Sequence, residues 1–88
     1  MSEAGAIAAV VAARPDLEIR NERLRVASVD GFPEFDYVTF TDEDGRPMIG
    51  GTTFVVADDG QVFECSGSLS PRANCIGVRN QRTGQSTL

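Results

Sequence analysis

The chain has 88 residues, of which 41% are hydrophobic and 24% charged, and its formal net charge is −5. This size and balance predict one small folded domain with a modest core, and they fit neither a disordered chain nor a membrane protein. All basic residues are arginine, and the sequence has no histidine, lysine or tryptophan. These absences exclude histidine acid–base catalysis, Ser-His triads and Schiff-base or P-loop lysines.

The first segment is predicted to form the one helix, over about residues 3–14. Ser2 can serve as N-cap, Ile7, Val10 and Val11 recur at helical spacing, and Pro15 follows the helix. The apolar run 6–13 is far shorter than the roughly 20 residues of a membrane-spanning helix. Because no basic leader precedes this run, we expect a cytoplasmic protein.

Four strands are expected after the helix. Alternating apolar residues and β-branched or aromatic composition mark each of them, and a change of parity at Asn21-Glu22 predicts a turn or bulge before the first. Gly60 suits the left-handed position of a three-residue hairpin loop between the last two strands. The expected strands are Arg23–Ala27, Phe35–Thr41, Gly51–Ala57 and Gln61–Cys65.

The C-terminal region beyond Ser66 is rich in Gly, Ser, Asn and Arg. Residues 75–78 are a candidate short edge strand, and residues 79–88 have no periodicity, so we expect a mobile tail there. The predicted fold class is therefore α+β, with one N-terminal helix packed on a small, mainly antiparallel sheet of about four strands. The domain is expected to cover residues 1–78. Its predicted core consists of Ile7, Val10, Val11, Leu24, Val26, Phe40, Phe54, Val56 and Phe63.

Catalytic and metal-binding groups are sparse in this sequence. Cys65 and Cys75 are expected to be free thiols, and two cysteines without histidine cannot complete a structural zinc site. The run 42–45 has its glycine at position four, whereas an EF-hand loop needs it at position six. Paired carboxylates leave glycosidase-like chemistry open by residue type, although the domain is small for a sugar cleft. We expect no enzyme, metal or cofactor.

Charge is unevenly distributed along the chain. Residues 30–64 contain nine acids and one arginine, whereas residues 65–88 carry three arginines and no acid. An acidic middle disfavours nucleic acid and attracts a basic protein partner, although solubility explains the acids equally well. The sequence leaves open whether the two acidic turns lie at the same end of the sheet. The candidate partner-binding residues are Asp42, Glu43, Asp44, Asp58 and Asp59.

The segment Tyr37-Val38-Thr39-Phe40, the hairpin sequence 50–63 and the exit 66–71 resemble the YrhB-like, immunity-protein-35 group of small bacterial proteins. The resemblance covers about residues 35–71. It implies a protein that neutralises a cognate polymorphic toxin by direct contact. Two alternatives stay open: an intracellular accessory or chaperone-like subunit that forms a homodimer or binds a partner through a sheet edge, and a small ligand-binding domain.

Overall fold

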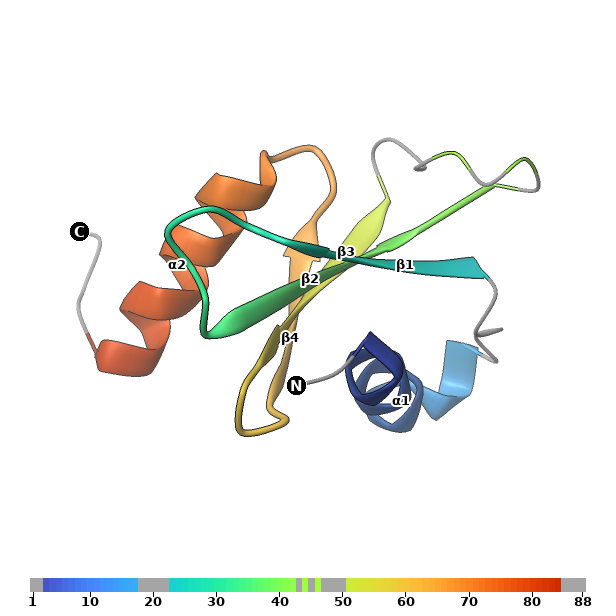
Figure 1. Cartoon of the computed structure of the whole chain (residues 1–88), viewed down its shortest axis with the longest axis horizontal. Helices are drawn as coiled ribbons and strands as arrows, with labels where there is room; N and C mark the ends of the chain where they lie inside the picture. The colour runs from blue at the N-terminus through green and yellow to red at the C-terminus, as the bar shows by residue number, and fades with distance from the viewer. Residues whose placement is uncertain (1–2, 18–22, 43, 45, 47–50, 85–88) are drawn as a thin grey trace.

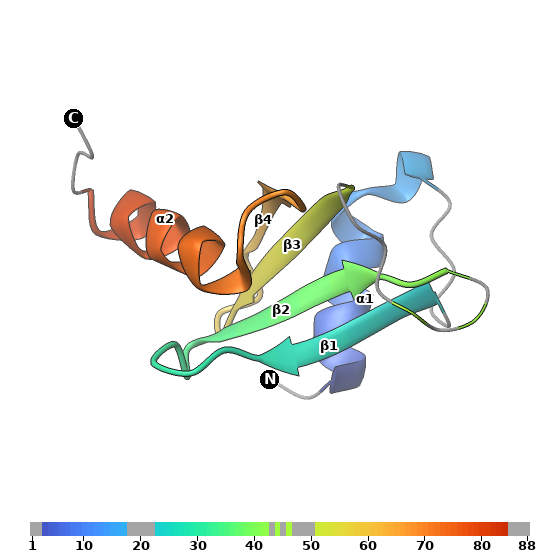
Figure 2. The same ribbon diagram turned by 90° about the horizontal axis from the view of Figure 1, so that it is seen from above.

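A computed structural model describes residues 3–17, 23–42, 44, 46 and 51–84 of the chain. Four antiparallel strands form one sheet in the order β1-β2-β3-β4, and the two helices lie on opposite faces of it (Figures 1 and 2). The α+β class is therefore confirmed. The elements are α1 (Glu3–Ala13), the 3-10 turn η1 (Pro15–Leu17), β1 (Leu24–Ser28), β2 (Phe35–Phe40), β3 (Thr52–Ala57), β4 (Val62–Ser66) and α2 (Pro71–Thr83).

The sheet is apolar on both faces, because each face is covered by a helix. Successive side chains of a strand point to opposite faces, so Phe54 and Val55 belong to different halves of the core. Helix α1 covers the face of Val38, Phe54 and Val56. On the other face, Cys75 and Val78 of α2 pack with Phe32, Phe35, Tyr37, Val55 and Ala57.

The β3–β4 hairpin confirms the strongest local prediction. Its loop is Asp58-Asp59-Gly60, the Ala57 N–H donates to the Gln61 carbonyl at 2.9 Å, and Gly60 has a φ of 89°. Glycine adopts this left-handed conformation without steric cost. All four strands lie within one residue of their predicted bounds.

Helix α1 also lies where the sequence predicts it. Arg14 follows its last residue and forms ion pairs with Asp16 and with Glu64 of β4, which attaches the end of α1 to that strand. The predicted cap Ser2 and the parity change at Asn21-Glu22 lie outside the described residues. Neither helix of the described chain has the length and apolar character needed to cross a bilayer.

A second helix replaces the predicted edge strand and the first part of the predicted tail. Residues 75–78 and Arg79–Thr83 belong to α2, whereas residues 85–88 lie outside the described part. The Ser70 hydroxyl caps α2 by accepting from the Ala73 N–H at 3.1 Å, Pro71 begins it, and Gly84 ends it with a φ of 74°. These are standard helix signals. Polar composition concealed them, because α2 buries only Asn74, Cys75 and Val78.

The predicted core covers mainly the α1-facing half of the observed core, and Phe63 is its one member in the other half. All nine predicted residues pack in the core clusters, four of them buried and five half-buried. The prediction missed most of the α2-facing half, since that half exists only because α2 covers it. The missed buried residues of that half are Phe32, Phe35, Tyr37, Val55, Ala57, Cys75 and Val78, and on the α1-facing side the prediction missed Ala6 and Val38.

Candidate functional site

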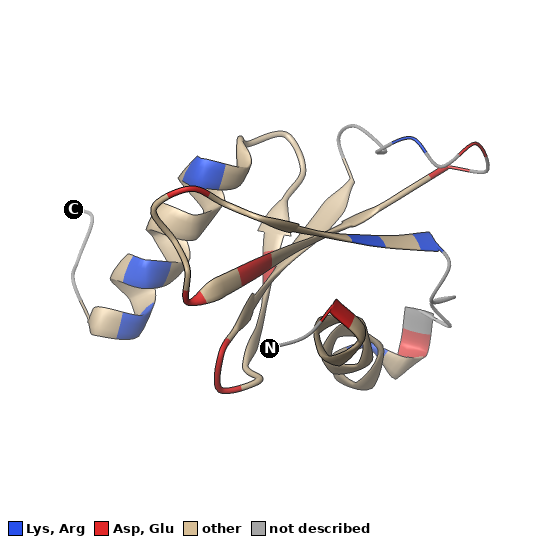
Figure 3. Ribbon diagram, in the orientation of Figure 1, with Lys and Arg blue, Asp and Glu red and all other residues tan. Residues whose placement is uncertain are grey.

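The two predicted acidic turns lie at opposite ends of the sheet. Phe35 pairs with Ala57, so Asp58 and Asp59 lie at the end where β2 begins, whereas Asp42 follows the other end of β2 (Figure 3). The six residues of β3 span roughly 20 Å at the usual rise per residue. That is about twice the Debye length at physiological salt. Asp42 and Asp44 therefore do not form one patch with Asp58 and Asp59, and Glu43 lies outside the described residues.

Two of these aspartates have a structural role in their own turns. Asp42 Oδ1 accepts from the backbone N–H groups of Asp44 and Arg46, both at 2.9 Å. Asp59 Oδ1 accepts from the N–H of Gln61 at 3.0 Å. Aspartate is favoured in turns for this reason, so the turn geometry by itself accounts for both carboxylates.

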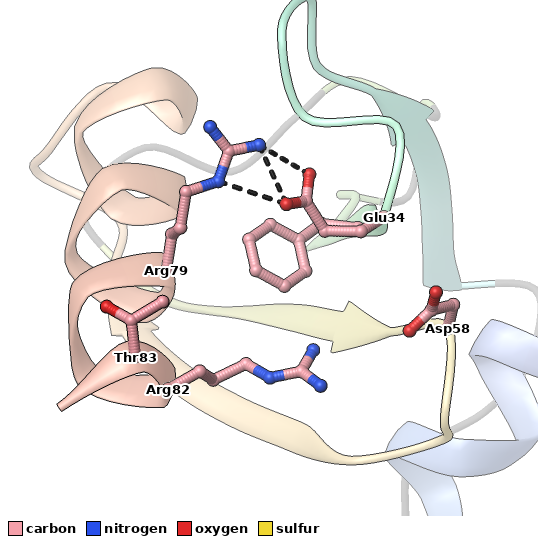
Figure 4. A pocket seen from close by; sticks show the side chains of 6 residues that line it. Glu34, Asp58, Arg79, Arg82 and Thr83 are labelled. Carbon is pink, nitrogen blue, oxygen red and sulfur yellow. Dashed lines mark hydrogen bonds and ion pairs between the residues drawn. The ribbon is translucent and has the colours of Figure 1, made fainter.

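The acids at the β3–β4 turn end face arginines of α2. Arg79 donates to both carboxylate oxygens of Glu34 at 2.6–3.0 Å (Figure 4). Arg82 donates to Asp59 at 3.2 Å. The positive charge predicted for a free tail thus neutralises part of the acidic middle within the same molecule. Acidic surface at this end is smaller than the sequence suggests.

Aromatic rings hold the same arginines in place. The Arg79 guanidinium lies 4.1 Å from the centroid of the Phe32 ring, and Arg72 and Arg82 lie 5.8 Å from the rings of Phe32 and Phe35. Such cation–π contacts each contribute about 0.5–1 kcal/mol at exposed sites. They attach one side of α2 to the β1–β2 connection and to the start of β2.

A hollow of about 370 Å³ opens between the C-terminal turns of α2 and this end of the sheet. Arg79 and Arg82 enter it from the helix, and Glu34 and Asp58 from the sheet side (Figure 4). Because Arg79 is already bound to Glu34 and to the Gly31 carbonyl, a charged ligand would have to displace internal partners. We infer that the charged residues around this hollow serve mainly to attach α2 to the sheet.

The Glu34–Arg79 pair makes the stability of the folded protein depend on pH in the acid range. Hydrogen bonds from Arg79 hold the pKa of Glu34 below its ordinary value of 4.5. The pair therefore stabilises the folded protein fully above about pH 4.5, and this contribution is lost as the pH falls through the lower folded-state pKa. In thermal melts across that range, Glu34→Gln should flatten the acid-side fall in Tm. Arg79→Gln should flatten it equally, and a full acid-side fall in Arg79→Gln would contradict the assignment.

The two thiols are unsuited to nucleophilic chemistry. Both are free cysteines, Cys75 buried and Cys65 half-buried. Burial raises the pKa of each, and for Cys75 the neighbouring Cys65 and Glu34 raise it further. The thiol form is thereby favoured over the reactive thiolate.

A buried polar network accompanies the thiols between α2 and the sheet. Asn74 Nδ2 donates to the Tyr37 hydroxyl at 2.8 Å and to the Ser66 carbonyl at 2.9 Å. The Tyr37 hydroxyl also bonds the Thr53 hydroxyl at 2.9 Å. In the described chain no buried side-chain N or O atom lacks a partner, so this network is complete without a ligand. Over the same residues, no three His, Cys, Asp or Glu side chains gather as metal ligands would.

A larger groove, of about 490 Å³, runs between β4 and α2. Its lining is mostly apolar or small, and Leu69 at its rim is 55% exposed. Sequence reasoning missed this site because α2 was not predicted; the Ser70-Pro71 start signal and the Asn74, Cys75, Val78 spacing are what could have indicated the helix. The lining residues are Val62, Phe63, Glu64, Cys65, Leu69, Ala73, Asn74, Gly77, Val78 and Gln81.

Comparison of the chain with family models, curated proteins and solved structures found no match. The resemblance to the immunity-protein-35 group thus stays an expectation.

Proposed function

We propose that this protein is a non-catalytic domain that acts by binding a partner protein directly, and that the partner is a cognate bacterial toxin, as the sequence resemblance implies. The observation that carries the proposal is the groove between β4 and α2. Its volume of about 490 Å³ lies within the range of small-molecule pockets, so it has room for a few side chains of a partner. The thiols, with their raised pKa values, and the fully paired Tyr37 hydroxyl offer no activated nucleophile.

The direct test is co-purification. A tagged version of this protein, expressed together with the product of an adjacent gene, should retain that product on the column and suppress its toxicity. Retention without suppression would support a binding domain but reject the immunity role. Failure of both would contradict the proposal as a whole.

A second candidate is an accessory or chaperone-like subunit that dimerises through a sheet edge. Within the described part of the chain no strand pairs with the outer edge of β4, which favours this candidate, since exposed strand edges pair readily with other strands. The two candidates predict different oligomeric states for the isolated protein. A mass that doubles with rising concentration supports the subunit, whereas a monomer at all concentrations supports the inhibitor.

If the acidic turns attract a basic partner at long range, they should raise the rate at which the inhibitor associates with it. Replacing Asp42, Asp44, Asp58 and Asp59 by Asn, and Glu43 by Gln, should slow association with a basic partner markedly and change dissociation less. Folding should survive, because an asparagine side-chain oxygen accepts the same turn hydrogen bonds. The measurement is the association rate by stopped flow across a tenfold range of salt.

The two ends of the sheet can be tested separately. Variants neutralised only at Asp42 and Asp44, or only at Asp58 and Asp59, should slow association unequally. The two ends lie more than a Debye length apart, so a partner that approaches one end is largely screened from the charges at the other. The more affected end is the one that faces the partner. An association rate independent of salt in the unsubstituted protein would exclude steering and leave the groove as the source of affinity.

A further inference from the structure

The edge strand β4 presents unpaired backbone groups beside the groove. In its pairing with β3, Gln61 and Gly67 stand at hydrogen-bonded positions. Strict alternation in an antiparallel ladder then turns the N–H and C=O groups of Val62, Glu64 and Ser66 away from β3. The Ser66 carbonyl is already used by Asn74 and by the Leu69 N–H. Val62 and Glu64 are left as the open part of the edge within the described chain.

The groove gives an added strand room for its side chains. Phe63 and Cys65 point to the α2 face of β4 and pack against the α2-facing core. Side chains of a strand added beside β4 would project to the same face at alternate positions. There they would meet Ala73 and Gly77, and a Cβ placed on Gly77 would meet no atom within 4 Å. The wall of the groove is therefore open at this position.

The charge of the groove lining limits which side chains of a partner can bind there. Glu64 is the single charged residue of the groove lining, and its carboxylate is bound by Arg14. Arg72, Arg79 and Arg82 lie against Phe32 and Phe35 on another side of α2. A charged side chain placed in the groove would lose hydration without gaining a counter-charge. A neutral groove is thus complementary to an uncharged segment.

From these three features we infer that the partner docks an extended, uncharged segment on β4 as a fifth strand, with alternate small apolar side chains in the β4–α2 groove. This inference rests on the proposed function and names the part of the partner that is recognised. The main-chain groups of Val62 and Glu64 supply the hydrogen bonds, and the groove selects the side chains, as in other cases of strand addition.

A model peptide tests the mode of docking without the partner. The probe is acetyl-Thr-Val-Thr-Val-Thr-amide, titrated into ¹⁵N-labelled protein. With so few contacts we expect a dissociation constant on the order of 1 mM, together with saturable shifts and slowed exchange at the Val62 and Glu64 amides. A peptide with proline at its centre should bind at least several-fold more weakly, because proline lacks the N–H donor. A peptide with glutamate at both valine positions should also bind more weakly.

Two variants of α2 test the groove. Gly77→Gln should abolish the peptide shifts by filling the groove with a side chain that the helix tolerates well. Ile76→Gln is the matched control, since Ile76 is 43% exposed and is not part of the lining. It should leave binding unchanged. Equal binding by both variants would overturn the inference.

Three further outcomes would also overturn it. They are peptide shifts on β1 in place of β4, no saturable shift at about ten times the expected dissociation constant, and concentration-dependent protection of Val62 and Glu64 without peptide. The last would show that a second copy of the chain occupies the edge. The proposed function is tested separately, since a co-purified partner that binds Gly77→Gln as well as the unsubstituted protein would reject this docking mode alone.

Discussion

Replacing Phe54 by alanine is expected to destabilise the protein by roughly 3–5 kcal/mol, the usual cost of removing a large buried aromatic side chain. Phe54 is fully buried at the centre of β3 and contacts the Phe40 ring edge-on, with centroids 5.8 Å apart. The loss is a large share of the roughly 5–15 kcal/mol that stabilises a typical domain. The melting temperature should fall by more than about 10 °C.

Ile76→Ala is the matched control for Phe54→Ala. Ile76 is a large apolar residue that is 43% exposed, so its truncation should change stability by no more than about 0.5 kcal/mol. Thermal melts and urea denaturation, both followed by far-UV circular dichroism, measure the two variants. A loss of only one or two degrees in the melting temperature of Phe54→Ala would contradict its burial under α1.

Asn74→Ala is expected to weaken the attachment of α2 while leaving the helix itself intact. The substitution removes the donor shared by the Tyr37 hydroxyl and the Ser66 carbonyl. The Tyr37 hydroxyl keeps its bond to Thr53, and the Ser66 carbonyl keeps its bond from the Leu69 N–H. The cost is therefore that of two lost hydrogen bonds, roughly 1–3 kcal/mol in total. Alanine is itself a strong helix former, so far-UV circular dichroism should change little. The signal that should change is near-UV circular dichroism, because Tyr37 is the single tyrosine of a chain without tryptophan.

Two comparisons make the Asn74 result specific. Asn80→Ala removes a half-buried asparagine from the same helix and should leave the tyrosine signal intact. In a double-mutant cycle with Tyr37→Phe, the two losses should be less than additive, because both variants remove the same hydrogen bond. Fully additive losses would show that Asn74 and Tyr37 act independently.

The elements from α1 to β4 could be read from the sequence because their signals are local. Alternation and β-branched residues mark β3, and Asp58-Asp59-Gly60 can form only a few kinds of turn, so the hairpin register followed. Phe54 and Val56 are buried as their pattern predicts. The absence of histidine and lysine is a property of the residue types alone.

The acidic turns show where local signals stop being sufficient. Their residues and turn roles are visible in the sequence, but their positions at opposite ends of the sheet depend on the antiparallel pairing of Phe35 with Ala57. The pairing of Glu34 with Arg79 joins residues 45 positions apart. No spacing rule encodes such a contact, so the predicted separation of acidic middle and basic tail did not describe the folded surface.

The sequence by itself determined the α+β class, the hairpin and the α1-facing half of the core. Only the tertiary structure decided the role of α2, and with it the second half of the core and the β4–α2 groove. The physical reason is that α2 buries just Cys75 and Val78 as apolar contacts and is attached by Asn74, Arg79 and Arg82 to distant strands and turns. A helix that buries so few apolar residues has only a narrow apolar stripe in its own sequence, and such a stripe is easily missed.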